Sequence, residues 1–553
     1  MNNSKILRSI GLIIVLGLFA LSLAACRREE EPVDPVALIG GDGIFAIPFD
    51  TVAELTVFMW SGSGEFLRDV GRREIAAEDI HGQNDANIIS VARAFNRHFP
   101  NIIINVYARS GGPNADGIPW TLYRENIRLE HGQFPDIFAI YKLDTDVMMG
   151  MVADLSIFQD DPMYQAFNPA IMDMLRIDDR LFGLPAYLLP WGIYVNRSLA
   201  DRENIDIPPI NWTIDQFFQF ANNSRPNDFY GGMSTLWVIA DSGTPDFHWQ
   251  LANRGPNDPF VRINSQATRN ILAMLPAMND HAIWPQNALG NIDGEFMGDG
   301  WWWGARFFAL NRLLTLEGDP WMMGDMAHGP DHWLGNVVAD WDIFPRPATN
   351  YIGNHVGIVL DPMGIRNFAM DDGNPVLSPS EYADLAVAWE FLKFKVGDTR
   401  AWEERSRQQF NDGDTWGAAA NDSFPVVTGQ AFYDQMELWF TGHRSVFQDA
   451  NRFPGFHRVM ELLLAGEFAR FSDKSTPWFY EFEGTQRRIL EEWIRKYAAE
   501  NAGASDLDPH WIDELFARLP DWEVQFNQRF EQAFADLAEA VARFYPIQQR
   551  GGR

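Results

Sequence analysis

The alternation of strand and helix patterns near the start of the chain most constrains its fold. Residues 54–60 (ELTVFMW) are rich in β-forming side chains and lead into a Gly-Ser turn. Apolar residues then recur with helical period over 88–99, Pro100 ends that pattern, and the β-branched run 102–106 follows. This β-α-β order predicts a three-layer α/β lobe, in which ligands bind at the edge formed by the carboxyl ends of the strands.

The same alternation continues through the rest of the chain. Further strands are predicted at 134–141, 188–195 and 356–360, and further helices at 121–130, 213–222, 271–278, 383–394 and 521–545. Thr213 and Gln216 have the spacing of a capping box, so we interpret Trp212 before them as a staple residue rather than a ligand contact. The aromatic face of the last helix is interpreted as core-facing rather than as a surface for a partner.

The first 51 residues predict export from the cytoplasm. Two basic residues precede the uncharged stretch 10–25, which is shorter than the roughly 20 apolar residues that span a bilayer. The run 23–26 (LAAC) resembles the bacterial lipoprotein box, which implies a cleaved signal peptide 1–25 and lipid attachment to Cys26; the alternative is an uncleaved anchor helix. Residues 26–51 are interpreted as a linker, and the rest of the chain is expected on the extracytoplasmic side of the cell membrane.

Charge and cysteine content exclude several classes of function. The chain has 75 acidic and 44 basic side chains, a formal net charge of −31, so its surface repels nucleic-acid backbones. Cys26 is the only cysteine, which excludes internal disulfides, cysteine-rich zinc modules and iron–sulfur clusters held by four thiolates. His328, Asp331 and His332 have metal-ligand chemistry, but a solvated loop is the simpler explanation, and we expect no metal and no cofactor.

Several motifs occur in an order that resembles one protein family. They are the strand 55–60, FPNIIINV at 99–106, PDI at 135–137, MVADLS at 151–156, LFGLP at 181–185 with GIYVN at 192–196, WDIFP at 341–345 and AWEFLK at 388–393. In this order they resemble the extracellular solute-binding proteins of ABC importers, family 1, in its sugar-type, maltose-binding-protein-like branch. The resemblance spans roughly residues 52–430; the segment 296–304 is a distorted form of the family's motif, and the tail beyond about 455 is longer.

This resemblance implies an α/β periplasmic-binding-protein type II fold, with two lobes joined by a hinge. Lobe 1 comprises 52–187 and 350–415 in this interpretation, and lobe 2 comprises 188–349 and 416–553 with an extended helical C-terminal region. The resemblance also implies a receptor that captures a solute outside the cell by hinge closure and delivers it to the permease subunits of an ABC importer without catalysis. We expect a monomer, and the aromatic content favours an oligosaccharide as the solute.

A sugar site needs flat aromatic faces for the C–H surfaces of the rings and planar polar groups for the hydroxyl edges. The chain has 21 tryptophans, and several lie on predicted loops, where core packing does not explain them. Candidates follow the first strand, flank the hinge near Pro190, or belong to a tryptophan run in the second lobe. The candidate ligand-binding residues are Trp60, Ser61, Glu65, Tyr187, Trp191, Trp301, Trp302 and Trp303.

Two alternatives remain open at this point. A secreted glycoside hydrolase or lyase needs a carboxylate pair, for which Asp144 with Asp146 or Asp178 with Asp179 are candidates, although 75 acidic residues produce such pairs by chance. A receptor of the same fold could instead bind a non-sugar solute such as a peptide or an anion. The sequence contains no serine nucleophile elbow, no phosphate-binding Gly-Lys motif and no His-Glu-x-x-His segment.

Overall fold

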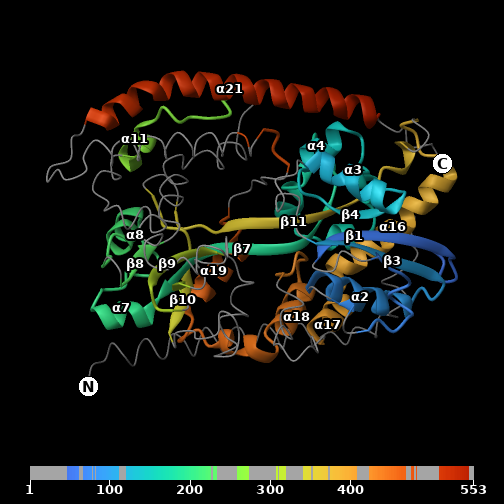
Figure 1. The fold of residues 1–553 in the computed structure, drawn as a ribbon, viewed down its shortest axis with the longest axis horizontal. Helices are drawn as coiled ribbons and strands as arrows, with labels where there is room; N and C mark the ends of the chain where they lie inside the picture. Colours follow the sequence, from blue (N-terminus) through green and yellow to red (C-terminus); the bar gives the residue numbers. More distant parts are fainter. Residues whose placement is uncertain are drawn as a thin grey trace.

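The computed structural model describes residues 47–61, 66–76, 79–80, 83–110, 120–225, 228–232, 258–272, 307–308, 310–318, 340–349, 353–370, 374–407, 423–468, 475–478, 481 and 510–546 (Figure 1). The strands are β1 (Ala53–Ser61), β2 (Phe66–Leu67), β3 (Ile102–Ser110), β4 (Ile137–Ala139), β5 (Arg176–Ile177), β6 (Arg180–Leu181), β7 (Leu184–Asn196), β8 (Tyr230–Gly232), β9 (Leu313–Gly318), β10 (Trp341–Phe344) and β11 (Gly357–Ile365). The α-helices are α2 (Gln83–Asn96), α3 (Trp120–His131), α4 (Leu143–Met148), α5 (Pro162–Ala166), α6 (Pro169–Asp173), α7 (Arg197–Glu203), α8 (Ile214–Ala221), α11 (Gln266–Leu272), α16 (Pro379–Gly397), α17 (Thr399–Arg407), α18 (Gln430–Trp439), α19 (Pro454–Ala465) and α21 (His510–Phe544). Short 3-10 helices are η3 (Leu155–Phe158), η6 (Phe368–Met370) and η8 (Gly442–Gln448).

One mixed sheet of nine strands organises these elements, in the order β2-β3-β1-β4-β11-β7-β9-β8, with β10 also paired to β7. β1 lies parallel to β3 and β4, and α2 connects β1 to β3, which confirms the predicted β-α-β order. β11 runs antiparallel between β4 and β7. β4 is shorter than the predicted strand 134–141, since Pro135 has no N–H to donate and pairing with β1 covers only Ile137 and Phe138.

β7 connects the two ends of the sheet. The strand has 13 residues, of which Leu184 to Trp191 pair with β11. From Gly192 onward it pairs with β9, and from Ile193 onward it also pairs with β10. At Gly192 a side-chain carbon would lie 2.7 Å from the Phe344 carbonyl oxygen, so only glycine fits where the partner changes. Figure 1 shows β7 and β11 running between a group of strands around β1 and a second group around β9.

Apolar side chains pack against the sheet in two clusters, of which the larger also reaches β9 and β10. The main cluster surrounds β1, β3, β4 and α16, and a second cluster lies between α8, β9 and β10. In the second cluster Trp212 is fully buried against Phe217 and Phe344, and its Nε1 donates a hydrogen bond to the Pro345 carbonyl oxygen at 2.7 Å. The predicted capping box of α8 is confirmed, and so is the interpretation of Trp212 as a core residue.

Helix α16 buries charged side chains as well as apolar ones. Every residue from Leu385 to the end of the helix is buried, so the predicted apolar stripe is only part of the covered surface. Lys393 Nζ donates hydrogen bonds to Asp161 Oδ2 and to Glu390 Oε1, both at 2.6 Å, and Trp389 Nε1 donates to the same Asp161 oxygen at 3.0 Å. Burial raises the pKa of Glu390 to about 7, although Lys393 opposes the shift.

The raised pKa of Glu390 predicts a pH-dependent stability. The folded pKa of about 7 lies above the ordinary value of 4.5, so this group stabilises the fold fully below pH 4.5 and loses that contribution as the pH rises through 7. The glutamine of Glu390→Gln does not ionise, so this variant should not lose that stability as the pH rises. Its free energy of unfolding, relative to that of the unmodified protein, is therefore expected to increase by about 2–3 kcal/mol between about pH 5 and pH 8. Urea unfolding at both pH values measures it, and a pH-independent difference would contradict the prediction.

The C-terminal helix α21 has 35 residues, and Figure 1 shows it running along the top of the molecule from near α11 to near α4. Near its end, Tyr545 joins the main cluster and its hydroxyl donates a hydrogen bond to the Val152 carbonyl oxygen at 2.8 Å. In the middle part of the helix, Phe530 is fully buried in a separate cluster with Phe260. The prediction that its aromatic face packs on a core is therefore confirmed.

Among the described helices, none combines the length and the apolar character needed to cross a membrane.

Candidate functional site

Most of the predicted ligand-binding side chains lie outside the described residues. This holds for Glu65, for the run Trp301, Trp302 and Trp303, and for the side chains of Trp60 and Ser61. The backbone of Trp60 and Ser61 ends β1 in register with the last residues of β3, at the carboxyl edge of the parallel strands. Cys26, the metal-ligand candidates at 328–332 and the predicted helical residues 273–278 also lie outside the described residues.

The two remaining candidates, Tyr187 and Trp191, lie on β7 beside the change of strand partner. Because side chains alternate along a strand, residues four positions apart point to the same face of the sheet. Tyr187 pairs with Asp361 of β11, and Trp191 pairs with Gly357. The structure therefore places both predicted hinge residues on one face, where β7 passes from the first group of strands to the second.

Polar side chains from two helices enclose Tyr187. Its hydroxyl donates a hydrogen bond at 2.7 Å to the Oδ1 of Asn84, which lies in the first turn of α2. Lys395, near the end of α16, places its Nζ 5.5 Å from the centroid of the tyrosine ring. Only 6% of Tyr187 is exposed, so the ring is almost completely covered in this conformation.

Trp191 is half-buried beside Gly357. A side-chain carbon at Gly357 would lie 3.0 Å from the Trp191 Cβ and 3.2 Å from the guanidinium carbon of Arg346, so glycine leaves the space that these two side chains share. The indole Nε1 is buried, and no group in the described part of the chain accepts a hydrogen bond from it. A buried donor without an acceptor costs about 1–3 kcal/mol, which a bound hydroxyl or carboxylate oxygen would recover.

Two buried cations near Tyr187 are not among the candidates from the sequence. Lys395 and Arg405 are 1% and 2% exposed, and the Arg405 guanidinium carbon lies 4.6 Å from the centroid of the Trp402 ring. Lys395 Nζ and Arg405 Nε and Nη2 have no hydrogen-bond partner among the described residues. Burial lowers the pKa of both groups, that of Arg405 to about 10, and Arg405 lowers the pKa of Lys395 further. The sequence signal for Lys395 is its place directly between the apolar residues Phe394 and Val396.

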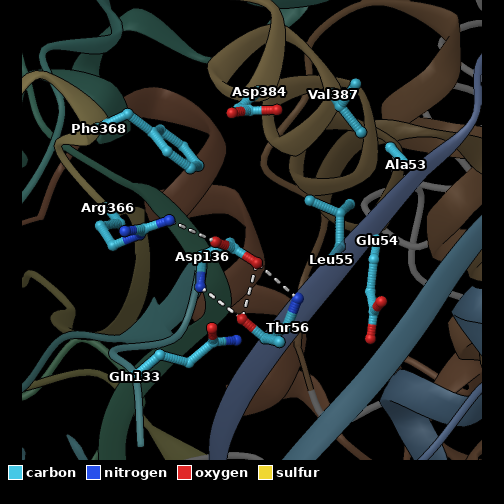
Figure 2. Close-up of a pocket in the computed structure, with 10 residues that line it drawn as sticks. All are labelled: Ala53, Glu54, Leu55, Thr56, Gln133, Asp136, Arg366, Phe368, Asp384 and Val387. Carbon is cyan, nitrogen blue, oxygen red and sulfur yellow. Dashed lines mark hydrogen bonds and ion pairs between the residues drawn. The ribbon is translucent and has the colours of Figure 1, made fainter. Parts of the chain in front are cut away.

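A cavity of about 260 Å³ lies at the opposite end of β1, near its first residues. Figure 2 shows Asp136 there: its Oδ2 accepts hydrogen bonds from Thr56 N at 2.8 Å and Thr56 Oγ1 at 2.7 Å, and its Oδ1 accepts from Arg366 Nη2 at 3.0 Å. These bonds join β1 to the residues that flank β4 and β11, so Asp136 stabilises the sheet. Solutes bind at the other edge of such sheets, so the cavity is not the candidate site.

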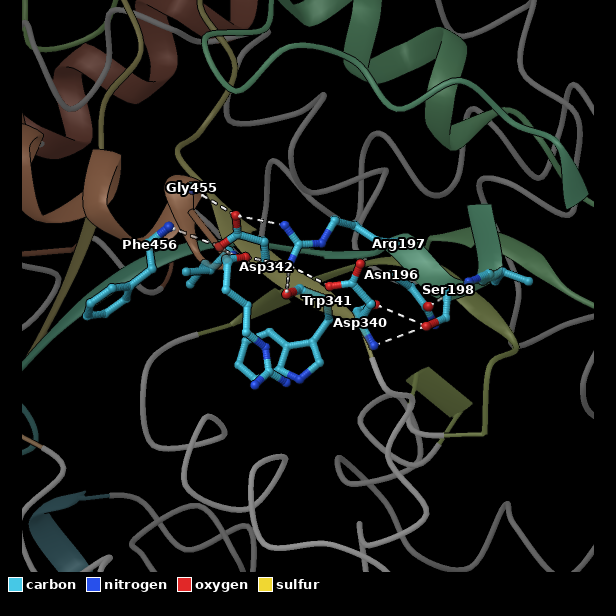
Figure 3. A network of polar contacts seen from close by, with 11 residues as sticks. Asn196, Arg197, Ser198, Asp340, Trp341, Asp342, Gly455 and Phe456 are labelled. Atoms are coloured by element: carbon cyan, nitrogen blue, oxygen red, sulfur yellow. Dashed lines mark hydrogen bonds and ion pairs between the residues drawn. The ribbon is translucent and has the colours of Figure 1, made fainter. Parts of the chain in front are cut away.

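A second polar network fixes the helices around β10 (Figure 3). Asp342 is fully buried and accepts hydrogen bonds from the main-chain nitrogens of Gly455 at 2.7 Å and Phe456 at 3.0 Å, at the start of α19. Burial raises the pKa of Asp342 to about 6, against the effect of these bonds and of Arg197 at 3.6 Å. Arg197 also forms an ion pair with Asp340 at 2.6 Å. The network therefore joins α7, β10 and α19.

The two carboxylate pairs that were candidates for a hydrolase site lie in a hairpin turn and in the first turn of a short helix. Asp178 and Asp179 form the turn of the β5–β6 hairpin, with φ angles of 51° and 61° that suit a type I′ turn. Asp144 and Asp146 are buried in the first turn of α4, which packs against α21, and burial raises the pKa of Asp144 to about 6. Within the described ranges, no group of three or more His, Cys, Asp or Glu side chains is placed to hold a metal ion.

Comparison with solved structures identifies the fold. An ABC substrate-binding protein from Listeria monocytogenes, in complex with cycloalternan, matches with a TM-score of 0.50 and 14% sequence identity, over 89% of this chain and 100% of that chain. The chain has the periplasmic-binding-protein fold. The fold class predicted from the sequence is thus confirmed. Maltose-bound MalE3 of T. maritima matches this periplasmic-binding-protein fold with a TM-score of 0.49 and 13% identity, over 85% of this chain and 100% of that chain. No protein-family model matches the sequence, and neither does any curated protein.

Proposed function

We propose that this chain is the extracytoplasmic receptor of an ABC importer and that it binds an oligosaccharide without catalysing a reaction. The observation that carries the proposal is the position of Tyr187 and Trp191, two aromatic residues on the strand that joins both parts of a periplasmic-binding-protein fold. The cycloalternan bound to the Listeria protein supports a carbohydrate as the solute. The unused donor of Trp191 supplies a polar contact beside a flat apolar face, which is the combination that sugars require.

In this proposal the solute binds between a lobe formed by 52–187 with 350–415 and a lobe formed by 188–349 with 416–553. Residues after β1 and the tryptophan run 301–303 contribute further contacts. Closure about β7 and β11 completes those contacts, so the solute shifts an equilibrium between open and closed conformations. A lipid on Cys26 holds the monomeric receptor at the membrane, where the permease subunits take up the solute.

Thermal-shift measurements on the mature protein test the solute class. We expect at least one malto-, manno-, xylo- or gluco-oligosaccharide to raise the melting temperature, since a ligand at 100 times its dissociation constant adds about 2.7 kcal/mol of stability. A peptide that stabilises the protein when no sugar does so would refute the carbohydrate assignment. Release of reducing sugar from a polysaccharide, abolished by a single Asp or Glu substitution, would replace the receptor proposal by a hydrolase or lyase.

Replacing Trp191 by alanine is expected to weaken binding of the stabilising sugar more than tenfold, equivalent to about 1.4 kcal/mol. The substitution removes both the stacking face and the Nε1 donor, whereas Trp191→Phe keeps a face and should cost less. Isothermal titration calorimetry measures both affinities. The matched control is Tyr433→Ala, which removes an exposed aromatic ring of α18 and should leave the affinity unchanged. Equal affinities for Trp191→Ala and the unmodified protein would exclude Trp191 from the site.

A further inference from the structure

We propose that Lys395 and Arg405 form the binding site for a carboxylate group of the solute, so that the preferred ligand is an acidic oligosaccharide that contains uronic acid units. This inference rests on the proposed function, because it names the class of sugar that the same site binds. It starts from the two buried cations beside Tyr187, for which the sugar-binding chemistry of neutral hydroxyl groups gives no reason.

Two cationic groups side by side in a protein interior are strongly disfavoured as charges unless an anion compensates them. Lys395 and Arg405 are almost completely buried, and their hydrogen-bond donors Nζ, Nε and Nη2 have no partner among the described residues. Besides burial, the groups that shift their pKa values are Arg405 for Lys395 and Tyr187 for Arg405, neither of which is a carboxylate. An unpaired buried charge is strongly unfavourable, and a like charge beside it adds repulsion. A bound carboxylate would supply both the missing charge and the missing acceptors.

The position of the two cations connects them to the candidate site. Lys395 Nζ lies 5.5 Å from the centroid of the Tyr187 ring, on the strand face that also carries Trp191. At the other end of this face, the guanidinium group of Arg346 lies beside Trp191 and Gly357. Aromatic rings and cations therefore occur together along one face of β7. A uronic acid presents a C–H face for such rings and a carboxylate at its edge.

The donor types also fit a carboxylate. The planar guanidinium group of arginine can donate two parallel hydrogen bonds to the two oxygens of a carboxylate, and the lysine ammonium group adds a compact charge with three donors. A neutral sugar hydroxyl carries no charge to compensate the cations, and its single oxygen cannot accept two parallel hydrogen bonds as the two oxygens of a carboxylate do. The pair therefore selects a uronic acid over the corresponding neutral sugar, which carries a hydroxymethyl group in place of the carboxylate.

Calorimetry with matched sugars tests the inference on the full mature protein. The probes are trigalacturonate, trimannuronate and triglucuronate, each paired with its neutral trisaccharide, and acetate at the same carboxylate concentration. We expect at least one acidic trisaccharide to bind at least tenfold more tightly than its neutral counterpart. Lys395→Met should lower that affinity at least tenfold and abolish the preference for the acidic over the neutral trisaccharide. The control Arg529→Gln, which removes an exposed charge from α21, should change neither.

The thermal stability of Lys395→Met without ligand provides a second readout. Because Lys395→Met removes a buried charge that has no partner among the described residues and keeps the approximate length of the side chain, its melting temperature without ligand should equal or exceed that of the unmodified protein. A strong loss of stability would show that Lys395 is already paired, and would overturn the inference.

The other outcomes separate this inference from the proposed function. Neutral trisaccharides that bind as tightly as the acidic ones would overturn the acidic-sugar inference and leave the sugar receptor intact. An acidic sugar whose affinity is unchanged in Lys395→Met would overturn the assignment of the site. An affinity for acetate equal to that for the acidic sugars would overturn the assignment to a sugar carboxylate. The absence of binding by every sugar, neutral or acidic, would overturn both proposals.

Discussion

Replacing Lys393 by methionine is expected to lower the free energy of unfolding by about 3–5 kcal/mol. Its ammonium group lies 2.6 Å from oxygens of both Asp161 and Glu390, and all three side chains are buried. Removing it leaves two carboxylates in the interior without the cation that they share. The loss should be larger above pH 7, where Glu390 is ionised, than at pH 5, where it binds a proton.

Urea unfolding followed by tryptophan fluorescence measures this effect. The matched control is Arg128→Gln on α3, which breaks the ion pair with Glu125 between side chains that are about half-exposed. Such surface pairs contribute about 0–1 kcal/mol, so this control should unfold almost like the unmodified protein. Adding Glu390→Gln to Lys393→Met should recover part of the loss, because one of the two uncompensated charges is then absent. A loss below about 1 kcal/mol for Lys393→Met would contradict the prediction.

Much of the framework could be predicted from the sequence because its signals are local. Pro100 separates α2 from β3, and the capping box of α8 identifies the start of that helix within a few residues. The β-branched run that became β3 needs only its own composition to indicate a buried strand. Each of these signals depends on neighbouring residues and not on where the rest of the chain packs.

The two lysines of α16 show why the candidate site could be predicted only in part. Lys393 and Lys395 are two positions apart, so they point to different sides of the helix. Lys393 donates hydrogen bonds to two carboxylates, whereas Lys395 lies near the Tyr187 ring and is repelled by Arg405. No local pattern distinguishes them, because their partners come from distant segments. Tyr187 and Trp191 could be identified from their place near Pro190, but the groups that face them could not.

The last helix has one feature that the sequence predicts and one that it does not. Its aromatic spacing predicts a buried face, which α21 has, but the spacing does not indicate what that face contacts. In the structure, Tyr545, directly after the C-terminal end of α21, belongs to the main cluster, and Phe530, in the middle part of the helix, belongs to a separate cluster with the segment 258–272. A single helix therefore joins two packing units that are far apart in the sequence.

Replacing Phe530 by alanine is therefore expected to have a large but local effect. The ring is fully buried, with its centroid 5.0 Å from that of Trp478 and 5.8 Å from that of Phe260. Truncating such a phenylalanine removes apolar contact and leaves a cavity, at a cost of about 3–5 kcal/mol. Because its cluster is separate from the main one, the cost should fall on local opening of the segment 258–272 and the adjoining half of α21.

Amide hydrogen exchange distinguishes this local effect from global unfolding. The amides of Val261 and Asn264 donate hydrogen bonds to Asn527 at 3.0 Å and Glu523 at 2.7 Å, so they should exchange at least about a hundredfold faster in Phe530→Ala. The control Val524→Ala, at an exposed position of the same helix, should leave these rates unchanged. Equal acceleration in β1 and β3 would show that the two clusters unfold together. Retained protection there is expected, because the bond from Tyr545 to Val152 holds the other end of α21 independently of Phe530.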